Sequence, residues 1–367
     1  MRGHIRKRNK DAWTVIVELP RDPVTGKRRQ KWVTVNGTKK EAEKELARLI
    51  NEIETGFYTE PSKMSFGEYL DLWLETMKNK VKQTTWNEYM YRTKRWRKTS
   101  IATKPLQKTT SMDIEIELQR FNLNPARTKD LYVIAKEALK KAVLTGFLNR
   151  NPMDAVAPPR AIQKEMKIWT KEEAATFLKA ATDSRHFALF YLALKTGARL
   201  GELLALQWED VDFERKMIQI KHSVTNISKK TVLQSPKTRS ALRTIPIDEA
   251  TVNVLKNHKK LNIEKALKLG FGRVHWVFWS NKTGRPLYLS NAGKAFRTAV
   301  KKSGVPMIRF HDLRHTHATF LLEANVHPKI VAERLGHSSI RITLDRYSHI
   351  LPNTQSEAVK AIKDIGF

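Results

Sequence analysis

Over the first 60 residues, the pattern of apolar and polar positions changes from that of strands to that of a helix. WTVIVEL (13–19) and QKWVTV (30–35) place their apolar residues as strands do, and HIRKR (4–8) can supply a third strand. From Thr38 onward apolar residues recur at helical spacing, and a glutamate three positions later completes the spacing of a capping box. We therefore expect residues 1–60 to form a small three-stranded sheet with one helix packed on it.

Residues 61–160 carry helical patterns and no strand pattern. Ser65 opens a second capping box, and a broad apolar face follows it. Further helices are predicted at 84–98, about 111–122 and 128–145. Proline-bearing segments flank this region, one around Pro61 and the other in NRNPMDAVAPPR (149–160). The pattern predicts a helical bundle, with basic exposed faces, between two linkers.

The rest of the chain, residues 161–367, is mixed. Helical patterns dominate beyond Thr170, and three strand-like stretches interrupt them: MIQIKHS (217–223), LRTIPI (242–247) and WVFWS (276–280). The expected fold class is therefore multidomain, mainly α with small β-sheets (α+β). The last domain is expected to be mostly helical with a short sheet.

Charge narrows the range of partners. The 68 Lys and Arg residues outnumber the 37 Asp and Glu residues, which gives a formal net charge of +31. A field of this size attracts polyanions, and nucleic acid is the polyanion whose binding gains most from neutralised phosphates. A membrane is disfavoured, because the basic residues are spread along the chain and no run of 18 apolar residues occurs.

Composition excludes several kinds of chemistry. The chain has no cysteine, so disulfides, thiolate catalysis and cysteine zinc sites are excluded. Its first residues, MRGHIRKRNKDAW, lack the apolar core of a secretory signal, so we expect the protein to stay in the cytoplasm where it is made.

Four stretches of the third region carry candidate chemistry. They are TGARLGELLALQWEDVD (196–212), SPKTRSALRTIPI (235–247), HDLRHTHATFLL (311–322) and LGHSSIRITLDRYSH (335–349). In order and spacing these stretches resemble those of the tyrosine recombinase family, also called phage integrases. The bundle resembles the core-binding domain of that family by position and pattern. The first 60 residues resemble the arm-binding domain of integrases from temperate phages and conjugative elements of Gram-positive bacteria.

The resemblance implies a catalytic set and a mechanism. Its six members are Arg199, Lys237, His311, Arg314, His337 and Tyr347. Members of the family cleave and rejoin DNA through a covalent 3′-phosphotyrosine. The resemblance therefore implies a site-specific recombinase that integrates and excises a mobile element.

The residue types fit this chemistry independently. Guanidinium groups such as Arg199 and Arg314 suit the charge that builds on phosphate oxygens, because each donates paired hydrogen bonds and keeps its proton. A phenol such as Tyr347 attacks only when it is oriented and relieved of its proton, a transfer in which His311 can take part. His337 can hold the phosphate, and Lys237 can protonate the leaving oxygen. No cofactor is expected, because the phosphotyrosine link conserves the bond energy and the chain has no GxxxxGK[ST] loop.

Each residue also has a simpler interpretation. Arg199 can form a buried ion pair with Glu202, which is a better candidate for a supporting residue than for a catalytic one. Lys237 has other basic residues nearby and is selected only by the resemblance. His311 and His315 lie four residues apart, but a zinc site needs a third ligand, so no metal is expected. His315 and His317 are interpreted as capping or packing residues.

Basic residues outside the third region are the candidates for gripping DNA. They are Arg6, Lys7, Arg8, Lys27, Arg28, Arg29, Lys31, Lys94, Arg95 and Arg97. A sheet face can read base edges in the major groove, whereas a solvated basic sheet would have no sequence preference. The expected partner is double-stranded DNA at core and arm attachment sites.

Further partners are implied by the resemblance. The tail QSEAVKAIKDIGF has the pattern of a short amphipathic helix, and in the family such tails often dock on a neighbouring subunit. A homo-oligomer on DNA, a tetramer, is therefore expected, together with a possible excisionase and a host DNA-bending protein. Two alternatives stay open: a DNA-relaxing enzyme like the type IB topoisomerases, and an inactive DNA-binding or architectural protein.

Overall fold

The structure is a computed structural model that describes residues 3–19, 21, 26–55, 62–160, 166–227, 230–234 and 242–347. The chain divides into two compact units, Met1–Gln163 and Lys164–Phe367. Among the described residues, no helix combines the length and the hydropathy needed to cross a membrane.

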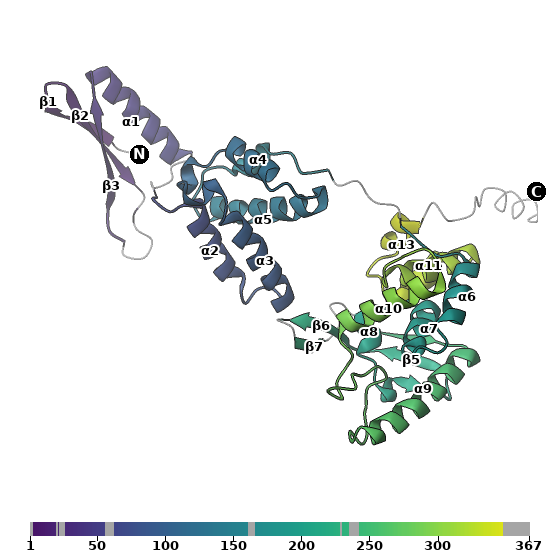
Figure 1. The fold of residues 1–367 in the computed structure, drawn as a ribbon. Helices are drawn as coiled ribbons and strands as arrows, with labels where there is room; N and C mark the ends of the chain where they lie inside the picture. The colour runs from purple at the N-terminus through teal and green to yellow at the C-terminus, as the bar shows by residue number, and fades with distance from the viewer. Residues whose placement is uncertain are drawn as a thin grey trace, which may run out of the picture. The chain divides into compact units, whose positions relative to one another are not determined.

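The first unit begins with an antiparallel sheet whose strands lie in the order β1-β2-β3 (Figure 1). The strands are β1 (Gly3–Asn9), β2 (Ala12–Leu19) and β3 (Arg29–Asn36), and helix α1 (Lys39–Glu54) follows them. Val15 and Val17 of β2 are fully buried in a cluster with Ala42 and Leu49 of α1. The predicted third strand is confirmed, as is the capping box at Thr38.

The same unit continues with the predicted helical bundle. Its helices are α2 (Phe66–Met77), α3 (Gln83–Trp96), α4 (Ser111–Arg120) and α5 (Pro125–Leu144). Trp96 and Phe66 are fully buried and make an edge-on ring contact. The indole of Trp96 also donates a hydrogen bond to the Leu131 carbonyl at 3.1 Å. A capping box starts α2 at Ser65, as the sequence predicts.

The second predicted linker is partly wrong. Its first half folds as a 3-10 helix (Pro152–Ala155), with Pro152 at the first position and Asn151 as its cap. Met153 and Val156 are buried in the bundle core, and Tyr132 donates a hydrogen bond to the Val156 carbonyl at 3.1 Å. Proline marks a helix start as well as a break, so the prolines alone did not distinguish a packed turn from a linker.

The second unit is mostly helical, as predicted. Its helices are α6 (Lys171–Ala180), α7 (Phe187–Thr196), α8 (Leu200–Leu204), α9 (Glu249–Lys268), α10 (Leu289–Ser303), α11 (Asp312–Glu323), α12 (Pro328–Leu335) and α13 (Ile340–Tyr347). A sheet in the order β4-β5-β8 comprises β4 (Val211–Asp212), β5 (Met217–Ile220) and β8 (Arg243–Pro246). A separate hairpin pairs β6 (Ser223–Ile227) with β7 (Lys230–Gln234). Helix α7 runs through the core of the unit, where Phe190 meets the ring of Phe296 from α10.

The predicted strand at residues 276–280 is wrong. This segment makes only isolated bridges, which join Trp276 to Gln207 and Trp279 to Pro286. Val277 and Phe278 are buried, and their backbone hydrogen bonds go to neighbouring loops and to the Asn262 side chain of α9. A short apolar run indicates burial, but it does not by itself distinguish a strand from a buried irregular segment.

Candidate active site

A sharp turn between α7 and α8 positions Arg199. Gly197 ends α7 in the left-handed conformation, with φ of +63°. A Cβ atom on this glycine would lie 2.6 Å from Cδ2 of Leu335 and 2.7 Å from Cδ2 of His317, so a larger residue would force these side chains to shift. Arg199 then caps α8, and both its backbone N–H (2.9 Å) and its guanidinium (2.8 Å) donate to the Glu202 carboxylate.

Glu202 links Arg199 to a second arginine, Arg243 of β8. Nη2 of Arg243 donates to Oε2 of Glu202 at 2.7 Å, and each of these two side chains is only 6% exposed. Burial by itself raises the pKa of Glu202. Hydrogen bonds and positive charge from Arg243 and Arg199 lower this pKa by a larger amount, so the net pKa lies below its ordinary range. Glu202 is therefore an ionised support for two guanidinium groups. Arg243 is not among the site residues predicted from the sequence. Its position as a charged residue within the apolar run LRTIPI could have indicated a buried, functional arginine.

Arg314, on the first turn of α11, is buried beside this pair. Its Nη1 donates to the Gly197 carbonyl at 2.9 Å. Its Nη2 is also buried and has no hydrogen-bond partner among the residues that the structure describes. Burial, together with the nearby charge of Arg199, lowers the pKa of Arg314 to about 9. A buried guanidinium with a spare donor is a site at which an anion would be strongly favoured.

Three histidines lie around the arginines. His311 precedes α11 and is exposed, whereas His315, one turn later, is 4% exposed. Their ring centroids are 5.1 Å apart, in an edge-on contact. His337 makes a hydrogen bond through Nδ1 with the Thr343 hydroxyl at 2.8 Å. Loss of solvation is the main cause that lowers the pKa of all three, and it acts even on the exposed His311, beside Arg314; the pKa falls to about 4 for His315 and about 3 for His337.

Tyr347 is the last residue of α13, and its side chain is 1% exposed. Its ring packs in a cluster with Val331 and Leu335 of α12. Its hydroxyl lies 2.5 Å from Nδ1 of His315. Burial raises the pKa of Tyr347 to about 12, so the phenol keeps its proton in this state.

Five of the six residues selected from the sequence therefore come from segments that meet here. Arg314 binds the backbone of the turn that carries Arg199, and Nη2 of Arg199 reaches the Gly336 carbonyl, next to His337, at 3.5 Å. The hydrogen bond between His315 and Tyr347 connects the end of α13 to α11. Lys237 lies outside the described residues. The simple ion pair of Arg199 with Glu202 does form, and Arg243 adds further positive charge beside it.

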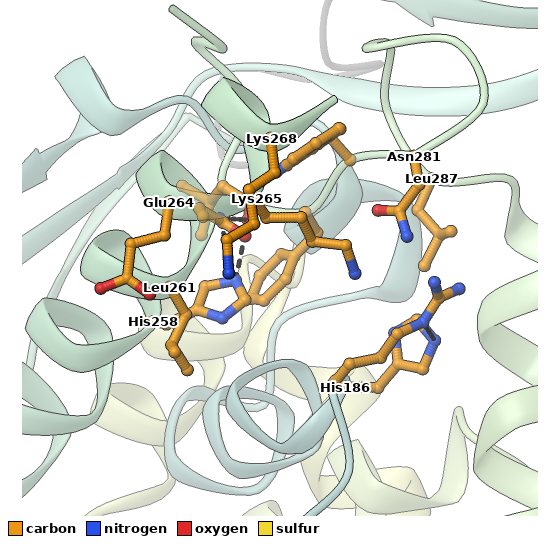
Figure 2. Close-up of a pocket in the computed structure, with 13 residues that line it drawn as sticks. His186, His258, Leu261, Glu264, Lys265, Lys268, Asn281 and Leu287 are labelled. Atoms are coloured by element: carbon orange, nitrogen blue, oxygen red, sulfur yellow. Dashed lines mark hydrogen bonds between the residues drawn. The ribbon is translucent and has the colours of Figure 1, made fainter. Parts of the chain in front are cut away.

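A separate pocket of about 360 Å³ lies at the other end of α7 (Figure 2). His186, which precedes α7, lines it together with Lys265 and Lys268 of α9 and Asn281 (Figure 2). None of the five clustered residues lines this pocket. The candidate active site and this pocket are therefore two separate features of the second unit.

The basic residues predicted to grip DNA lie in different surroundings. Alternation along β1 places Arg6 and Arg8 on the sheet face away from α1, and Lys7 on the face of α1. Trp32 of β3 shares the face of Arg6 and is 59% exposed.

Of the remaining basic residues predicted to bind DNA, Lys27 and Arg28 are exposed, Arg29 is half-buried, and Lys31 shares the face of Val17. Lys94 and Arg95 lie in the last turn of α3, and Arg97 forms an ion pair with Asp71.

Comparisons with known proteins identify the family. Residues 167–354 match the Phage integrase family, residues 4–53 an Arm DNA-binding domain, and residues 65–121 the N-terminal SAM-like domain of phage integrases. The chain belongs to the Phage integrase family of tyrosine recombinases, whose members cleave and rejoin DNA through a tyrosine intermediate. It is thus an enzyme of site-specific recombination, of the kind that mobile elements carry.

Particular relatives extend over nearly the whole chain. A "Tyrosine recombinase XerC-like" protein of Caldanaerobacter subterraneus is 30% identical over 98% of this chain and 97% of the relative. The ICEBs1 integrase of Bacillus subtilis is 27% identical, with 98% and 99% covered.

Solved structures share the fold. The Tn1549 transposon integrase in complex with a circular intermediate DNA has a TM-score of 0.68 at 20% identity, over 81% of this chain and 98% of that one. A lambda integrase tetramer bound to a Holliday junction has a TM-score of 0.58 at 22% identity, over 91% and 95%. At this level of identity the likeness concerns the fold alone.

Proposed function

We propose that Tyr347 attacks a DNA phosphate held by Arg199 and Arg314. The observation that carries this proposal is the buried Nη2 of Arg314, which has no partner among the described residues. A phosphate oxygen is the acceptor that would satisfy this donor. Two guanidinium groups then stabilise the charge that builds up as the phosphate is attacked.

The other members of the set have supporting roles. His337, fixed by Thr343, holds the phosphate from the side of α13. His311 is exposed and takes part in the transfer of the tyrosine proton. Lys237 protonates the leaving 5′ oxygen. The 3′-phosphotyrosine conserves the energy of the broken bond, so the strands are rejoined without a cofactor.

The remaining regions bind the DNA. We infer an arm-type DNA-binding domain at 1–60, a core-binding domain at 61–160 and the catalytic domain at 161–367. The match to an Arm DNA-binding domain supports contact of the first domain with a separate arm site, through residues such as Arg6 and Arg8. The ten basic residues contact phosphates or add to the positive field around the duplex, and Arg6 and Arg8 on the outer sheet face make the most direct contacts.

The proposed assembly is a tetramer on double-stranded DNA. A related integrase has been solved as a tetramer on a Holliday junction, which supports this arrangement. The tail is proposed to link neighbouring subunits, and an excisionase and a host DNA-bending protein are proposed to set the direction. The relatives from transposons and phages support integration and excision of a mobile element, which would take place in the cytoplasm of a bacterial host.

A suicide DNA substrate built from the sequence that flanks the gene tests the mechanism. Wild type is expected to form a covalent protein–DNA adduct, and Tyr347→Phe to bind the same DNA without forming one. Relaxation of supercoils without strand exchange between two sites would favour the topoisomerase-like alternative. Absence of an adduct on all flanking sequences would favour a DNA-binding or architectural protein.

A further inference from the structure

His315 is the residue in contact with the nucleophile. Its Nδ1 lies 2.5 Å from the Tyr347 hydroxyl, and the two ring centroids are 5.8 Å apart. The sequence interpretation treated His315 as a capping or packing residue. The structure instead directs its ring at the one hydroxyl that has to lose a proton for DNA to be cleaved.

The direction of this hydrogen bond follows from the two environments. Burial keeps the phenol protonated, because it raises the pKa of Tyr347 to about 12. Burial also keeps the imidazole neutral, because it lowers the pKa of His315 to about 4. The phenol therefore donates, and Nδ1 of His315 accepts with its proton on Nε2.

The position of His315 also offers the proton a way out. The Tyr347 side chain is 1% exposed, so hydroxide from bulk water does not reach the hydroxyl directly. On its other side, His315 contacts the ring of His311, which is exposed. The three rings thus form a series from the buried phenol to the surface of the site.

We propose that His315 is the proton acceptor of Tyr347 during attack on DNA. As the phenol oxygen bonds to phosphorus, its proton moves to Nδ1 of His315, the bond from phosphorus to the 5′ oxygen breaks, and that oxygen takes a proton from the general acid. The imidazolium then releases a proton from Nε2 toward His311 and solvent. Strand rejoining reverses each transfer. The assignment rests on the proposed role of Tyr347 as the nucleophile.

The proton moves from Tyr347 to His315 only while the tyrosine attacks DNA, and not in the resting state. Formation of the bond to phosphorus lowers the proton affinity of the phenol oxygen, and the charge of the entering phosphate raises that of the imidazole. The groups that face His315 from α11, from α13 and from the segment before α13 are His311, Asp312, Arg314, Arg346 and His337. Among these the cations predominate, so an entering phosphate offsets the charges that keep His315 neutral.

Variants at position 315 test the proposal in the full chain. His315→Ala removes both the hydrogen bond and the base, whereas His315→Asn keeps a polar atom near the place of Nδ1 but cannot take up the proton. We expect both to lower single-turnover cleavage of the suicide substrate by about 100-fold or more. In His315→Ala, whose shorter side chain opens a path for solvent to the phenol, the rate should then rise by about tenfold per pH unit above neutrality, because hydroxide has to replace the base. Added imidazole should partly restore His315→Ala.

The matched control is His317→Asn on the same helix. His317 is also buried, but its Nδ1 faces the Leu194 carbonyl at 2.7 Å and not the nucleophile. This variant should keep the pH dependence of wild type. Wild-type cleavage by His315→Ala would overturn the proposal, and so would full recovery in His315→Asn, since a positioning role alone would then suffice. Loss of the adduct in Tyr347→Phe reports on the proposed function separately.

A second measurement does not depend on the folding of these variants. In full-length protein with ¹⁵N-labelled histidine, one imidazole should carry its proton on Nε2 and show a hydrogen-bonded Nδ1. That signal should change in Tyr347→Phe, which removes only the hydroxyl. A histidine spectrum that is unaltered by Tyr347→Phe would overturn the assignment.

Discussion

Glu202 and Arg243, which lie 41 residues apart in the chain, form a buried ion pair at 2.7 Å. The same carboxylate binds Arg199 at 2.8 Å, so a single negative charge supports two guanidinium groups. This relationship explains how a site made mostly of cations is held together before DNA arrives.

Replacing the shared carboxylate should therefore damage both stability and cleavage. Glu202→Gln keeps the shape of the side chain but removes the buried negative charge that Arg243 and Arg199 share, which should lower the free energy of unfolding by about 3–5 kcal/mol. Urea denaturation and suicide-substrate cleavage measure the two effects. The control is Glu249→Gln, whose carboxylate pairs with Lys216 at the surface and should change stability by less than about 1 kcal/mol. Equal effects of the two variants would contradict the supporting role of Glu202.

The second prediction concerns the turn that carries Arg199. Gly197→Ala adds a Cβ at 2.6 Å from Leu335, at a backbone position with φ of +63°. Gly304→Ala is the matched control, because Gly304 ends α10 with φ of +76° and a Cβ there meets nothing within 4 Å. The control should cost about 1–2 kcal/mol for the backbone alone. Gly197→Ala should cost about 1–3 kcal/mol more, through overpacking, as measured by urea denaturation. A smaller loss in Gly197→Ala would contradict the close packing.

The third prediction separates the shape of Arg314 from its charge. Arg314→Lys keeps a positive charge but replaces the planar fork by one compact ammonium group, which cannot reproduce the two separated donors Nη1 and Nη2, so cleavage should fall by about 100- to 1000-fold. Arg309→Lys, at a 77% exposed side chain that pairs with Asp312, should stay within about threefold of wild type. Single-turnover adduct formation at saturating protein measures both. Full activity of Arg314→Lys would show that paired hydrogen bonds are not required.

The fourth prediction compares neighbours on opposite faces of β1. Arg6→Gln should weaken binding to arm-type DNA and lower the slope of log affinity against log salt by about one. Lys7→Gln changes the same charge on the face of α1 and should have a smaller effect. Titrations at several salt concentrations measure the slopes. Equal slopes for the two variants would indicate that the overall positive charge of the domain, and not one face of the sheet, attracts the DNA.

The fifth prediction concerns pH and stability. Burial, followed by the charge of Arg334, lowers the pKa of His317 to about 3, so the folded chain keeps it neutral while the unfolded chain protonates it near its ordinary value. The resulting stability is present above about pH 6.5 and is lost as pH falls, at about 1.4 kcal/mol per pH unit. Urea denaturation at neutral and mildly acidic pH measures this loss. His317→Asn should show a smaller loss over the same range, and an unchanged loss would contradict a buried neutral histidine.

Much of the fold follows from local patterns in the chain. Thr38 and Ser65 start helices where their capping boxes predict them, because a cap needs only residues three positions apart. The three strands of the N-terminal sheet follow from apolar alternation in the same local way. Segment 276–280 was mistaken for a strand, because burial from surrounding loops gives the same apolar run as a sheet does.

The sequence by itself also selected the candidate catalytic residues. Arg199, Lys237, His311, Arg314, His337 and Tyr347 all occur in short recognisable stretches. Only the tertiary structure decided how those that it describes are held. The contacts of Arg243 with Glu202 and of His315 with Tyr347 join segments 41 and 32 residues apart. Contacts of this kind leave no periodic trace in the chain, because they depend on where the helices pack and not on the spacing within any one of them.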